Sequence, residues 1–302
     1  MTALSKGSGS VRRLALSASA KVNLTLEVLG KRGDGYHEIA TVLQAVDLSD
    51  RLALEDAPHS LVFATDSPGV PPDADNLVAR AAALLRQAAR VERGACMRLE
   101  KRIPVAAGLG GGSSDAAATL LGLNRLWGLR WSFERLTEVA AALGMDVPFF
   151  LRGGRAVATG RGDHVRRLAG SGGYALVLVS PNLRLSTREM YGLVTARVFS
   201  DGARTQAMIE ALARRNATLV AANLYNGLEL VAEPAYPVIG QMKAALVSAG
   251  ALGAVMSGSG PTVFGVARSL DHARQIRRRV ARSSWSCWSV RTVAGPAVRL
   301  RG

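Results

Sequence analysis

The chain has 302 residues, 48% of them hydrophobic and 20% charged, which supplies enough apolar material for one large domain or two ordinary ones. Two cysteines are too few for a disulfide framework, the 4 scattered histidines give no zinc-binding pattern, and no apolar run reaches the roughly 18 residues of a membrane span. The net charge of +15 favours anionic partners, that is nucleotides, nucleic acid or anionic lipid.

Residues 1–11 are polar, rich in glycine and serine, and lack the apolar core of a signal peptide. We therefore expect a disordered lead-in and, with so few cysteines, a cytoplasmic protein. From Leu14 to Leu29 apolar and polar residues alternate, which predicts a long strand with one buried and one open face. Lys21 and Asn23 share the open face, either as solvated residues or as the floor of a site.

A glycine-rich turn at residues 30–35 leads into Tyr36 and His37. Beyond it, the apolar periodicity predicts strands at 41–54 and 60–64, a helix that is capped by Asp75 or Asn76 and runs to Arg90, and a strand that ends at Ile103.

The stretch from Pro104 to Ala118 reads Pro-Val-Ala-Ala-Gly-Leu-Gly-Gly-Gly-Ser-Ser-Asp-Ala-Ala-Ala and passes into a helical run at 113–127. Glycine permits positive φ and lets a ligand approach bare backbone, and a helix start offers unpaired N–H groups. Together these features predict a phosphate cradle. No lysine follows the last glycine, so this is not the common P-loop. The alternative is a flexible linker before an ordinary helix.

A helix is expected from Ser132 to Gly144, and Asp146 follows just before Val-Pro. An aspartate there, with proline in the first turn, is typical of a helix N-cap, which the local pattern favours over a catalytic role. A strand and a Gly-Arg-Gly turn at 153–163 end the first half. We therefore place a domain boundary after residue 163, between domains at 12–163 and 164–302.

The second half begins with a buried strand at 174–180 and a helix from Thr187. Thr187 and Tyr191 share one face of that helix, where Tyr191 serves either packing or binding. The remaining periodic segments predict helices at 204–214, 237–249 and 270–282, short strands around a glycine-rich turn at 253–265, and a last strand at 285–293. Alternating strands and helices in both halves indicate an α/β or α+β architecture.

Three motifs occur in a fixed order: Lys21-x-Asn23-Leu24, the loop from Pro104 to Ser114, and Gly-Ser-Gly-Pro-Thr-Val-Phe from Gly258 to Phe264. With these motifs the chain, from about residue 14 to 293, resembles the GHMP kinases. The resemblance implies a two-domain α+β fold: an N-terminal domain like the second domain of a small-subunit ribosomal protein, a ferredoxin-like C-terminal domain, and a substrate cleft between them. It also implies phosphorylation of a small alcohol by ATP with Mg²⁺.

Gly33-x-Gly35-Tyr36-His37, Gly144-x-Asp146-Val147-Pro148, and Thr187 with Tyr191 narrow the resemblance to members whose alcohol is linked to cytidine diphosphate. By this resemblance Asp146 matches the general base and Lys21 its charge-stabilising partner. The substrate pocket is matched by Asn23, Tyr36, His37, Thr187 and Tyr191. The ATP-binding positions are matched by Asn76, Lys101, Pro104, Val105, Ala106, Ala107, Gly108, Leu109, Gly110, Gly111, Gly112, Ser113 and Ser114, with Ser113 or Ser114 as the Mg²⁺ ligand.

The chain departs from that pattern at three places. Ala106 and Ala107 replace glycines, which stiffens the first turn of the loop. Leu43 replaces an aromatic residue and is expected to form an aliphatic wall for the cytosine. Asp115 replaces an asparagine and is expected to add a negative charge near the phosphates.

Two alternative functions stay open. The first is a GHMP kinase of another small alcohol, such as mevalonate, homoserine or a sugar, although Tyr36 and Tyr191 favour a nucleobase. The second is a basic RNA-binding protein on the ribosomal-type domain, although no strand interleaves aromatic with basic residues. The arginine-rich part from Arg268 to Arg301 fits solvated helix faces or an anionic partner. We expect ATP and a small molecule as partners, and neither a specific nucleic acid nor a membrane.

Overall fold

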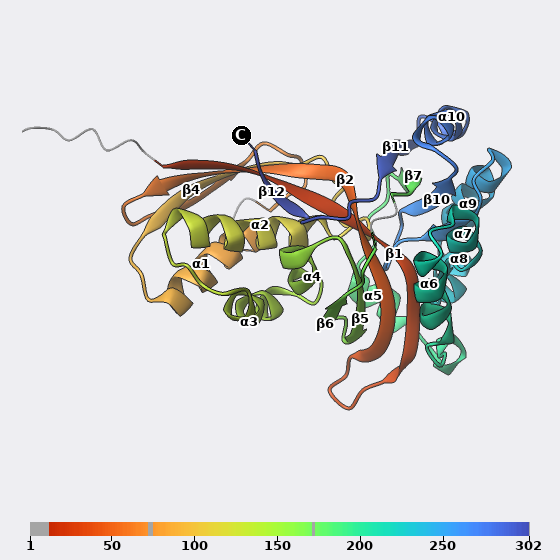
Figure 1. The fold of residues 1–302 in the computed structure, drawn as a ribbon, viewed down its shortest axis with the longest axis horizontal. Helices are drawn as coiled ribbons and strands as arrows, with labels where there is room; N and C mark the ends of the chain where they lie inside the picture. The colour runs from red at the N-terminus through yellow and green to blue at the C-terminus, as the bar shows by residue number, and fades with distance from the viewer. Residues whose placement is uncertain (1–11, 72–74, 171–172, 302) are drawn as a thin grey trace, which may run out of the picture.

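The computed structural model describes residues 12–71, 75–170 and 173–301, so the predicted lead-in lies outside the described residues. Two sheets organise these residues, an eight-stranded one mostly from the first half and a four-stranded one from the second (Figure 1). Helices α1 to α4 lie on one face of the large sheet, and the remaining helices gather around the small one. The α+β expectation is confirmed.

The large sheet is built on one long antiparallel hairpin, β1 (Arg13–Lys31) with β2 (His37–Ala57). Its strand order is β12-β1-β2-β4-β3, with β5 and β6 extending from β2 and β8 pairing with β1. The other strands are β3 (Leu61–Thr65), β4 (Gly94–Glu100), β5 (Arg155–Gly160), β6 (His164–Arg167), β8 (Tyr225–Asn226) and β12 (Val298–Arg301).

The β1–β2 register shifts between Ser19 and Lys21 and again between Asn23 and Thr25. Irregularities of this kind bend a strand and re-aim its side chains, and they are common beside active sites. The polar face of β1 is also not open as predicted, because Lys21, Asn23 and Thr25 are each less than a tenth exposed. The second half of the chain covers that face.

Four helices cover the large sheet: α1 (Leu77–Ala89), α2 (Gly111–Leu126), α3 (Phe133–Leu143) and α4 (Val147–Arg152). The central helix is α2, whose alanines at 116–118 are fully buried. A Cβ on Gly122 would lie 2.3 Å from Leu54 Cδ1, so α2 approaches the sheet as closely as a bare backbone allows. This packing fixes where α2 begins.

The small antiparallel sheet has the order β11-β7-β10-β9. Its strands are β7 (Ala175–Pro181), β9 (Ala254–Met256), β10 (Val263–Ala267) and β11 (Trp285–Arg291). The helices around it are α5 (Thr187–Gly192), α6 (Ala203–Ala213), α7 (Ala217–Ala222), α8 (Glu229–Ala235), α9 (Val238–Ser248) and α10 (Leu270–Val280), with a 3-10 turn at Ala196–Val198. The short elements α7, α8, β8 and β12 are absent from the sequence prediction.

The predicted domain boundary after residue 163 falls in the turn between β5 and β6, which pair with each other. The large sheet therefore continues to Arg167, and β8 and β12 return to it from the second half. The division into domains at 12–163 and 164–302 stays a proposal.

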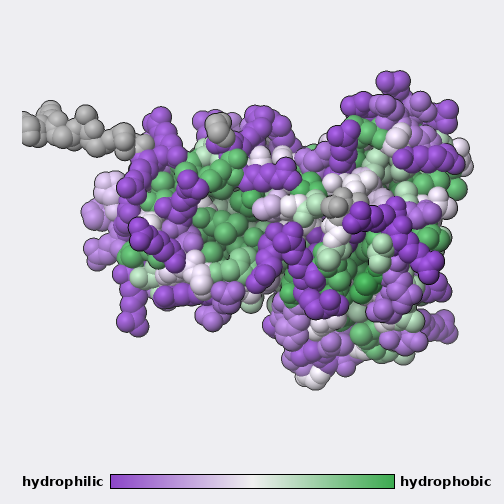
Figure 2. All heavy atoms as spheres, viewed as in Figure 1, coloured by the Kyte–Doolittle hydropathy of each residue, from purple (hydrophilic) through white to green (hydrophobic). Residues whose placement is uncertain are grey.

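Much of the positive charge lies on the outer surface. Hydrophilic side chains cover α10 and the margins of the face in Figure 2, while hydrophobic ones gather nearer its middle. Helix α10 buries Ala273, Ile276 and Val280 and exposes arginines on its other side, as a solvated amphipathic helix does. Among the described residues, no helix combines the length and apolarity needed to cross a bilayer.

Candidate active site

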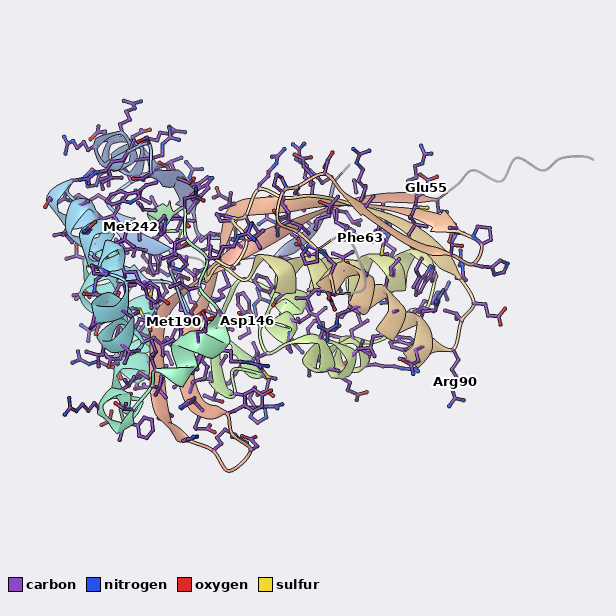
Figure 3. The ribbon with its side chains drawn as sticks, turned by 180° about the vertical axis from the view of Figure 1, so that it is seen from behind. Glu55, Phe63, Arg90, Asp146, Met190 and Met242 are labelled. Atoms are coloured by element: carbon purple, nitrogen blue, oxygen red, sulfur yellow. The ribbon has the colours of Figure 1, made fainter. Side chains whose placement is uncertain are left out.

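A cleft of about 1330 Å³ lies between the two halves of the chain. Its walls come from β1, the β1–β2 hairpin, the glycine-rich loop, the residues before α4, the start of α5, and Gly258 with Ser259. Figure 3 shows Asp146 where the helical part of the second half faces the first half. The cleft thus gathers all three motifs found in the sequence.

Lys21 and Asp146 meet in this cleft. Lys21 Nζ lies 3.5 Å from Asp146 Oδ2 and donates to Asn23 Oδ1 at 2.7 Å. Asn23 Nδ2 in turn donates to Thr41 Oγ1 at 2.8 Å, which fixes the amide. The Lys21 side chain is 5% exposed and that of Asp146 37% exposed. The carboxylate therefore faces the cleft, and the ammonium that supports it is buried.

The prediction that the Asp146 side chain caps a helix is wrong. Asp146 occupies the N-cap position of α4, but its side chain makes no capping hydrogen bond. Its φ of −82° and ψ of −16° are helical, whereas a capping residue has extended backbone that turns its side chain onto the helix N–H groups. The carboxylate is therefore free to pair with Lys21 and to face the cleft.

The glycine-rich loop ends at Gly110, the N-cap of α2, so the helix begins two residues earlier than predicted. Gly110 has a φ of +69°, and a Cβ there would lie 2.7 Å from Phe150 Cζ and 3.1 Å from Lys21 Cγ. The Lys21 N–H also donates to the Leu109 carbonyl oxygen at 3.0 Å. Because Gly110 has no side chain to cap the helix, the first N–H groups of α2 are available to an anion.

Ser257, directly before Gly258 in the glycine-rich turn of the second half, joins this loop to β1. Its Oγ donates to the Gly108 carbonyl oxygen at 3.0 Å and accepts from the Asn23 N–H at 3.4 Å. Asn226 Nδ2 holds the same turn by donating to the carbonyl oxygens of Met256 and Gly258, at 2.8 Å each. The turn from the second half thus supports the glycine-rich loop, a contact that sequence reasoning missed.

Lys101 lies in a buried cluster with two carboxylates. Its Nζ is 2.5 Å from Asp50 Oδ2 and 2.8 Å from Asp115 Oδ2. Asp50 Oδ1 accepts the N–H groups of Arg102 and Ile103, the residues that lead into the loop. One ammonium therefore ties β2, the entry to the loop and helix α2 together. Asp50 carried no signal in the sequence, because its partners lie far along the chain.

We expected Asp115 to add a free negative charge near the phosphates. In the structure this charge is instead paired with Lys101. Asp115 is 1% exposed, and burial raises its pKa to about 7, with Asp50 adding to the rise and Lys101 opposing it. Burial also opposes the charge of Lys101, but the two carboxylates outweigh that effect and raise the pKa of Lys101.

We predict that Asp115→Asn changes the pH dependence of stability. Because folding raises the pKa of Asp115, its stabilising contribution is present below about pH 4 and is lost as the pH rises to about 7. The free energy of unfolding should therefore fall more for the wild type than for the variant across this window. Urea denaturation of both proteins at several pH values measures this, since shared titrations cancel in the difference. A pH-independent difference would contradict it.

The other end of the cleft carries aromatic rings. His37 and Tyr191 have ring centroids 5.4 Å apart, and Tyr36 is 50% exposed at the rim. Burial, and then the charge of Asp146, raises the pKa of Tyr191, so the phenol stays protonated. Burial, with the Lys31 charge, lowers the pKa of His37 and favours the neutral imidazole. Thr187 Oγ1 lies 2.9 Å from Ser259 Oγ across the same end.

Of the other residues predicted to bind ATP, some line the cleft and others support its walls. Asn76 lines the cleft and also caps α1, its Oδ1 accepting from the Val78 N–H at 2.8 Å. Ser113 lines the cleft, whereas Ser114 is fully buried. The expectation for Leu43 is wrong: it is fully buried in the core beneath the sheet and forms no wall of the cleft.

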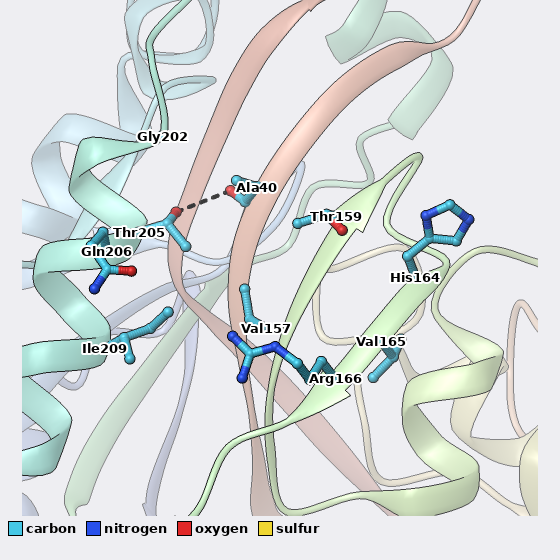
Figure 4. Close-up of a pocket in the computed structure, with 10 residues that line it drawn as sticks. All are labelled: Ala40, Val157, Thr159, His164, Val165, Arg166, Gly202, Thr205, Gln206 and Ile209. Atoms are coloured by element: carbon cyan, nitrogen blue, oxygen red, sulfur yellow. Dashed lines mark hydrogen bonds between the residues drawn. The ribbon is translucent and has the colours of Figure 1, made fainter.

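A smaller hollow of about 480 Å³ lies between α6 and strands β5 and β6 (Figure 4). Thr205 Oγ1 donates to the Ala40 carbonyl oxygen at 3.3 Å beside it. Its lining includes His164 and Arg166 but no carboxylate and no glycine-rich turn within the described residues. The large cleft is therefore the candidate for phosphoryl transfer.

Comparison with known proteins agrees with this geometry. The GHMP kinases N terminal domain matches residues 76–154, and the GHMP kinases C terminal domain matches residues 208–287. The chain belongs to the GHMP kinase family, whose members phosphorylate an alcohol group with ATP.

Within that family, the chain is 48% identical to a 4-diphosphocytidyl-2-C-methyl-D-erythritol kinase of Pelotomaculum thermopropionicum, over 91% of this chain and 96% of that protein. It is 45% identical to the protein of the same name from Symbiobacterium thermophilum, over 93% of this chain and all of that one. A crystal structure of 4-(cytidine 5'-diphospho)-2C-methyl-D-erythritol kinase superposes with a TM-score of 0.82 at 37% identity, covering 93% of this chain and 100% of that one. A homoserine kinase of Cytophaga hutchinsonii, at 18% identity and a TM-score of 0.77 over the full length of both chains, shares the fold.

Proposed function

We propose that this chain transfers the γ-phosphoryl group of ATP to the 2-hydroxyl of 4-diphosphocytidyl-2-C-methyl-D-erythritol, a step of the non-mevalonate route to isoprenoid precursors, in the cytoplasm. The observation that carries the proposal is the Lys21–Asp146 pair, 3.5 Å apart, beside a glycine turn that leads into α2. Relatives of that name, 48% and 45% identical, support the choice of substrate.

The chemistry follows from the geometry of the cleft. Phosphoryl transfer needs positioning and charge neutralisation more than covalent assistance. In this proposal Asp146 accepts the proton of the attacking hydroxyl, since its carboxylate is open to the cleft. Lys21 faces the negative charge of the phosphoryl group in transit. The N–H groups at the start of α2 hold the phosphates of ATP, and the transfer is direct and in line.

Mg²⁺ fits the start of α2, because hydroxyl and carboxylate oxygens are the hard ligands that this ion prefers. Ser114 Oγ and Asp115 Oδ1 are buried there with no hydrogen-bond partner in the part of the chain that the structure describes, and Ser113 lines the cleft. We assign the ion to Ser113, whose hydroxyl borders the cleft, because the Asp115 charge is paired with Lys101. A bound Mg²⁺ supplies charge neutralisation at the phosphate oxygens.

The aromatic end of the cleft suits the cytosine of this substrate. Tyr36 and Tyr191 offer π-faces, and the amide of Asn23 with the hydroxyl of Thr187 offers hydrogen bonds between the rings and Asp146. An acceptor without a base, such as mevalonate or homoserine, would leave these rings unused. The rings therefore favour the cytidylyl substrate over the other alcohols of the family.

We predict that Tyr191→Ala raises KM for the cytidylyl substrate by about 5- to 150-fold, because stacking of a base on an aromatic ring contributes about 1–3 kcal/mol. KM for ATP should stay unchanged, since the glycine-rich loop lies at the other end of the cleft. Steady-state kinetics with each substrate varied in turn measures both constants. Leu193→Ala, just beyond α5 and outside the cleft lining, is the matched control. A similar loss for both substrates would argue against stacking.

Coupled ADP release tests the function as a whole. We expect turnover with the cytidylyl substrate and little or none with mevalonate, homoserine or galactose at equal concentration. Preference for one of those alcohols would favour the first alternative. Salt-sensitive RNA binding without any ATP turnover would favour the second, the RNA-binding protein that the charge of +15 suggested.

A further inference from the structure

The turn between β5 and β6 places a guanidinium beside the Tyr36 ring and brings the turn's backbone next to Met145. Arg161 Cζ lies 5.2 Å from the centroid of the Tyr36 ring. At the next residue, Gly162, a Cβ would lie 3.2 Å from Ile39 Cδ1 and 4.0 Å from the Cβ of Met145, the neighbour of Asp146. Arg161 and Gly162 both line the cleft. The turn therefore spans the interval between Tyr36 and the proposed base.

The guanidinium of Arg161 is held in a fixed orientation. Its Nη2 and Nε donate to Asp163 Oδ2 at 2.8 and 3.3 Å, and its backbone N–H donates to Asp163 Oδ1 at 3.2 Å. Asp163 is itself largely buried, with 13% of its side chain exposed. These bonds leave Nη1 without a hydrogen-bond partner among the described residues. An arginine whose side chain is already held by the protein binds a phosphate at a smaller cost in side-chain conformational entropy.

The other cations that line the cleft differ from Arg161, because Lys101 and Lys21 pair with carboxylates that also line the cleft, whereas Asp163, which pairs with Arg161, is not part of the lining. Lys101 is paired with Asp50 and Asp115, and Lys21 is engaged by Asn23 and Asp146. Lys31 and Arg188 are exposed, and no salt bridge fixes either of them within the described residues. Arg161 is the cation that is both positioned by the protein and close to Tyr36.

We infer that Arg161 binds the diphosphate that links the nucleoside to the alcohol, and so selects nucleoside diphosphates over nucleosides and monophosphates. This inference rests on the proposed function, because it takes a base at Tyr36 and an attacking hydroxyl at Asp146. The two phosphates of such a substrate lie between these groups. A planar guanidinium donates to phosphate oxygens with a geometry that an ammonium does not match.

The inference is tested with three ligands that differ in their number of phosphates, namely cytidine, CMP and CDP. Each is titrated calorimetrically into the wild type and into Arg161→Gln. The wild type should bind CDP more tightly than CMP, and CMP more tightly than cytidine. In the variant CDP affinity should fall by about 10- to 100-fold, as expected when a charge-assisted hydrogen bond is lost. Cytidine and ADP should bind both proteins equally. Arg161→Lys should recover part of the CDP affinity.

Arg166→Gln is the matched control, because Arg166 lies on the same hairpin but lines the smaller hollow instead. It should bind all ligands as the wild type does. An equal loss of cytidine and CDP in Arg161→Gln would overturn the inference, since it would show that Arg161 only supports Tyr36. Unchanged CDP affinity would also overturn it. A wild type that binds ADP but neither cytidine nor CDP would instead contradict the proposed function, so the two failures are distinguishable.

Discussion

Replacing Asp146 with Asn is expected to lower kcat by about 10²–10⁴-fold, the range that positioned general base catalysis supplies. The amide has the shape of the carboxylate but accepts no proton from the attacking hydroxyl. KM for ATP should change little, because the glycine-rich loop contacts Lys21 rather than Asp146. Thermal stability should also be retained, since the Asp146 side chain caps no helix and is 37% exposed. Steady-state kinetics and a thermal melt measure these quantities.

Two further variants sharpen this result. Asp271→Asn removes an exposed carboxylate on α10 and should turn over normally. Lys21→Met should also lower kcat, and the double variant with Asp146→Asn should be hardly slower than the worse single variant, because residues that act as a unit are not additive. Near-normal turnover of Asp146→Asn would show that the base is another group.

Replacing Gly108 with Ala is expected to have the largest effect on the loop itself. Gly108 has a φ of +75°, and a Cβ there would lie 2.2 Å from the Ser257 carbonyl oxygen and 3.0 Å from the backbone N and O of Gly260. Backbone atoms cannot move aside as the end of a flexible side chain can. Left-handed strain of about 1–2 kcal/mol adds to overpacking of about 1–3 kcal/mol. We expect the free energy of unfolding to fall by that sum and ATP affinity to weaken.

Gly295→Ala is the control for this prediction, because no atom of residues 12–71, 75–170 or 173–301 lies within 4 Å of a Cβ there and its φ needs no glycine. It should leave both stability and ATP affinity unchanged. Urea denaturation gives the first quantity and calorimetric titration with ATP the second. If Gly108→Ala were as stable as the wild type and bound ATP equally well, the contact between the glycine-rich loop and the Ser257 turn would have no role in binding.

Local patterns predicted most of the secondary structure well. The alternation from Leu14 to Leu29 gave β1 to within two residues at either end, and the caps at Ser132 and Gly144 gave α3 as observed. Such signals succeed because each depends on neighbours within one or two turns of the chain. The short elements α7 and α8 were missed, because segments of six or seven residues show too little periodicity.

The same patterns misjudged which residues are buried. Glu27 belongs to the polar face of β1, which the alternation from Leu14 to Leu29 predicts to be open, yet it is fully buried and accepts the Thr205 N–H at 2.7 Å, at the start of α6. For Glu27 the covering element comes from elsewhere in the chain, so periodicity within the strand carries no information about it. The family resemblance, rather than periodicity, made Leu43 a wall of the cleft, and Leu43 lies in the core.

The sequence by itself determined the glycine-rich loop, the Lys-x-Asn strand and membership of the GHMP kinase family, because these are runs of residues whose chemistry is local. The resemblance implied that Lys21 is the partner of Asp146, and the tertiary structure brings the two side chains within 3.5 Å of each other. Only the tertiary structure decided that the Asp146 side chain caps no helix, that Lys101 joins Asp50 to Asp115, and that Ser257 supports the loop. Each of these pairs joins residues far apart in the chain. Their contacts are set by how α2 and the second half pack against the bent β1–β2 hairpin, which no local pattern encodes.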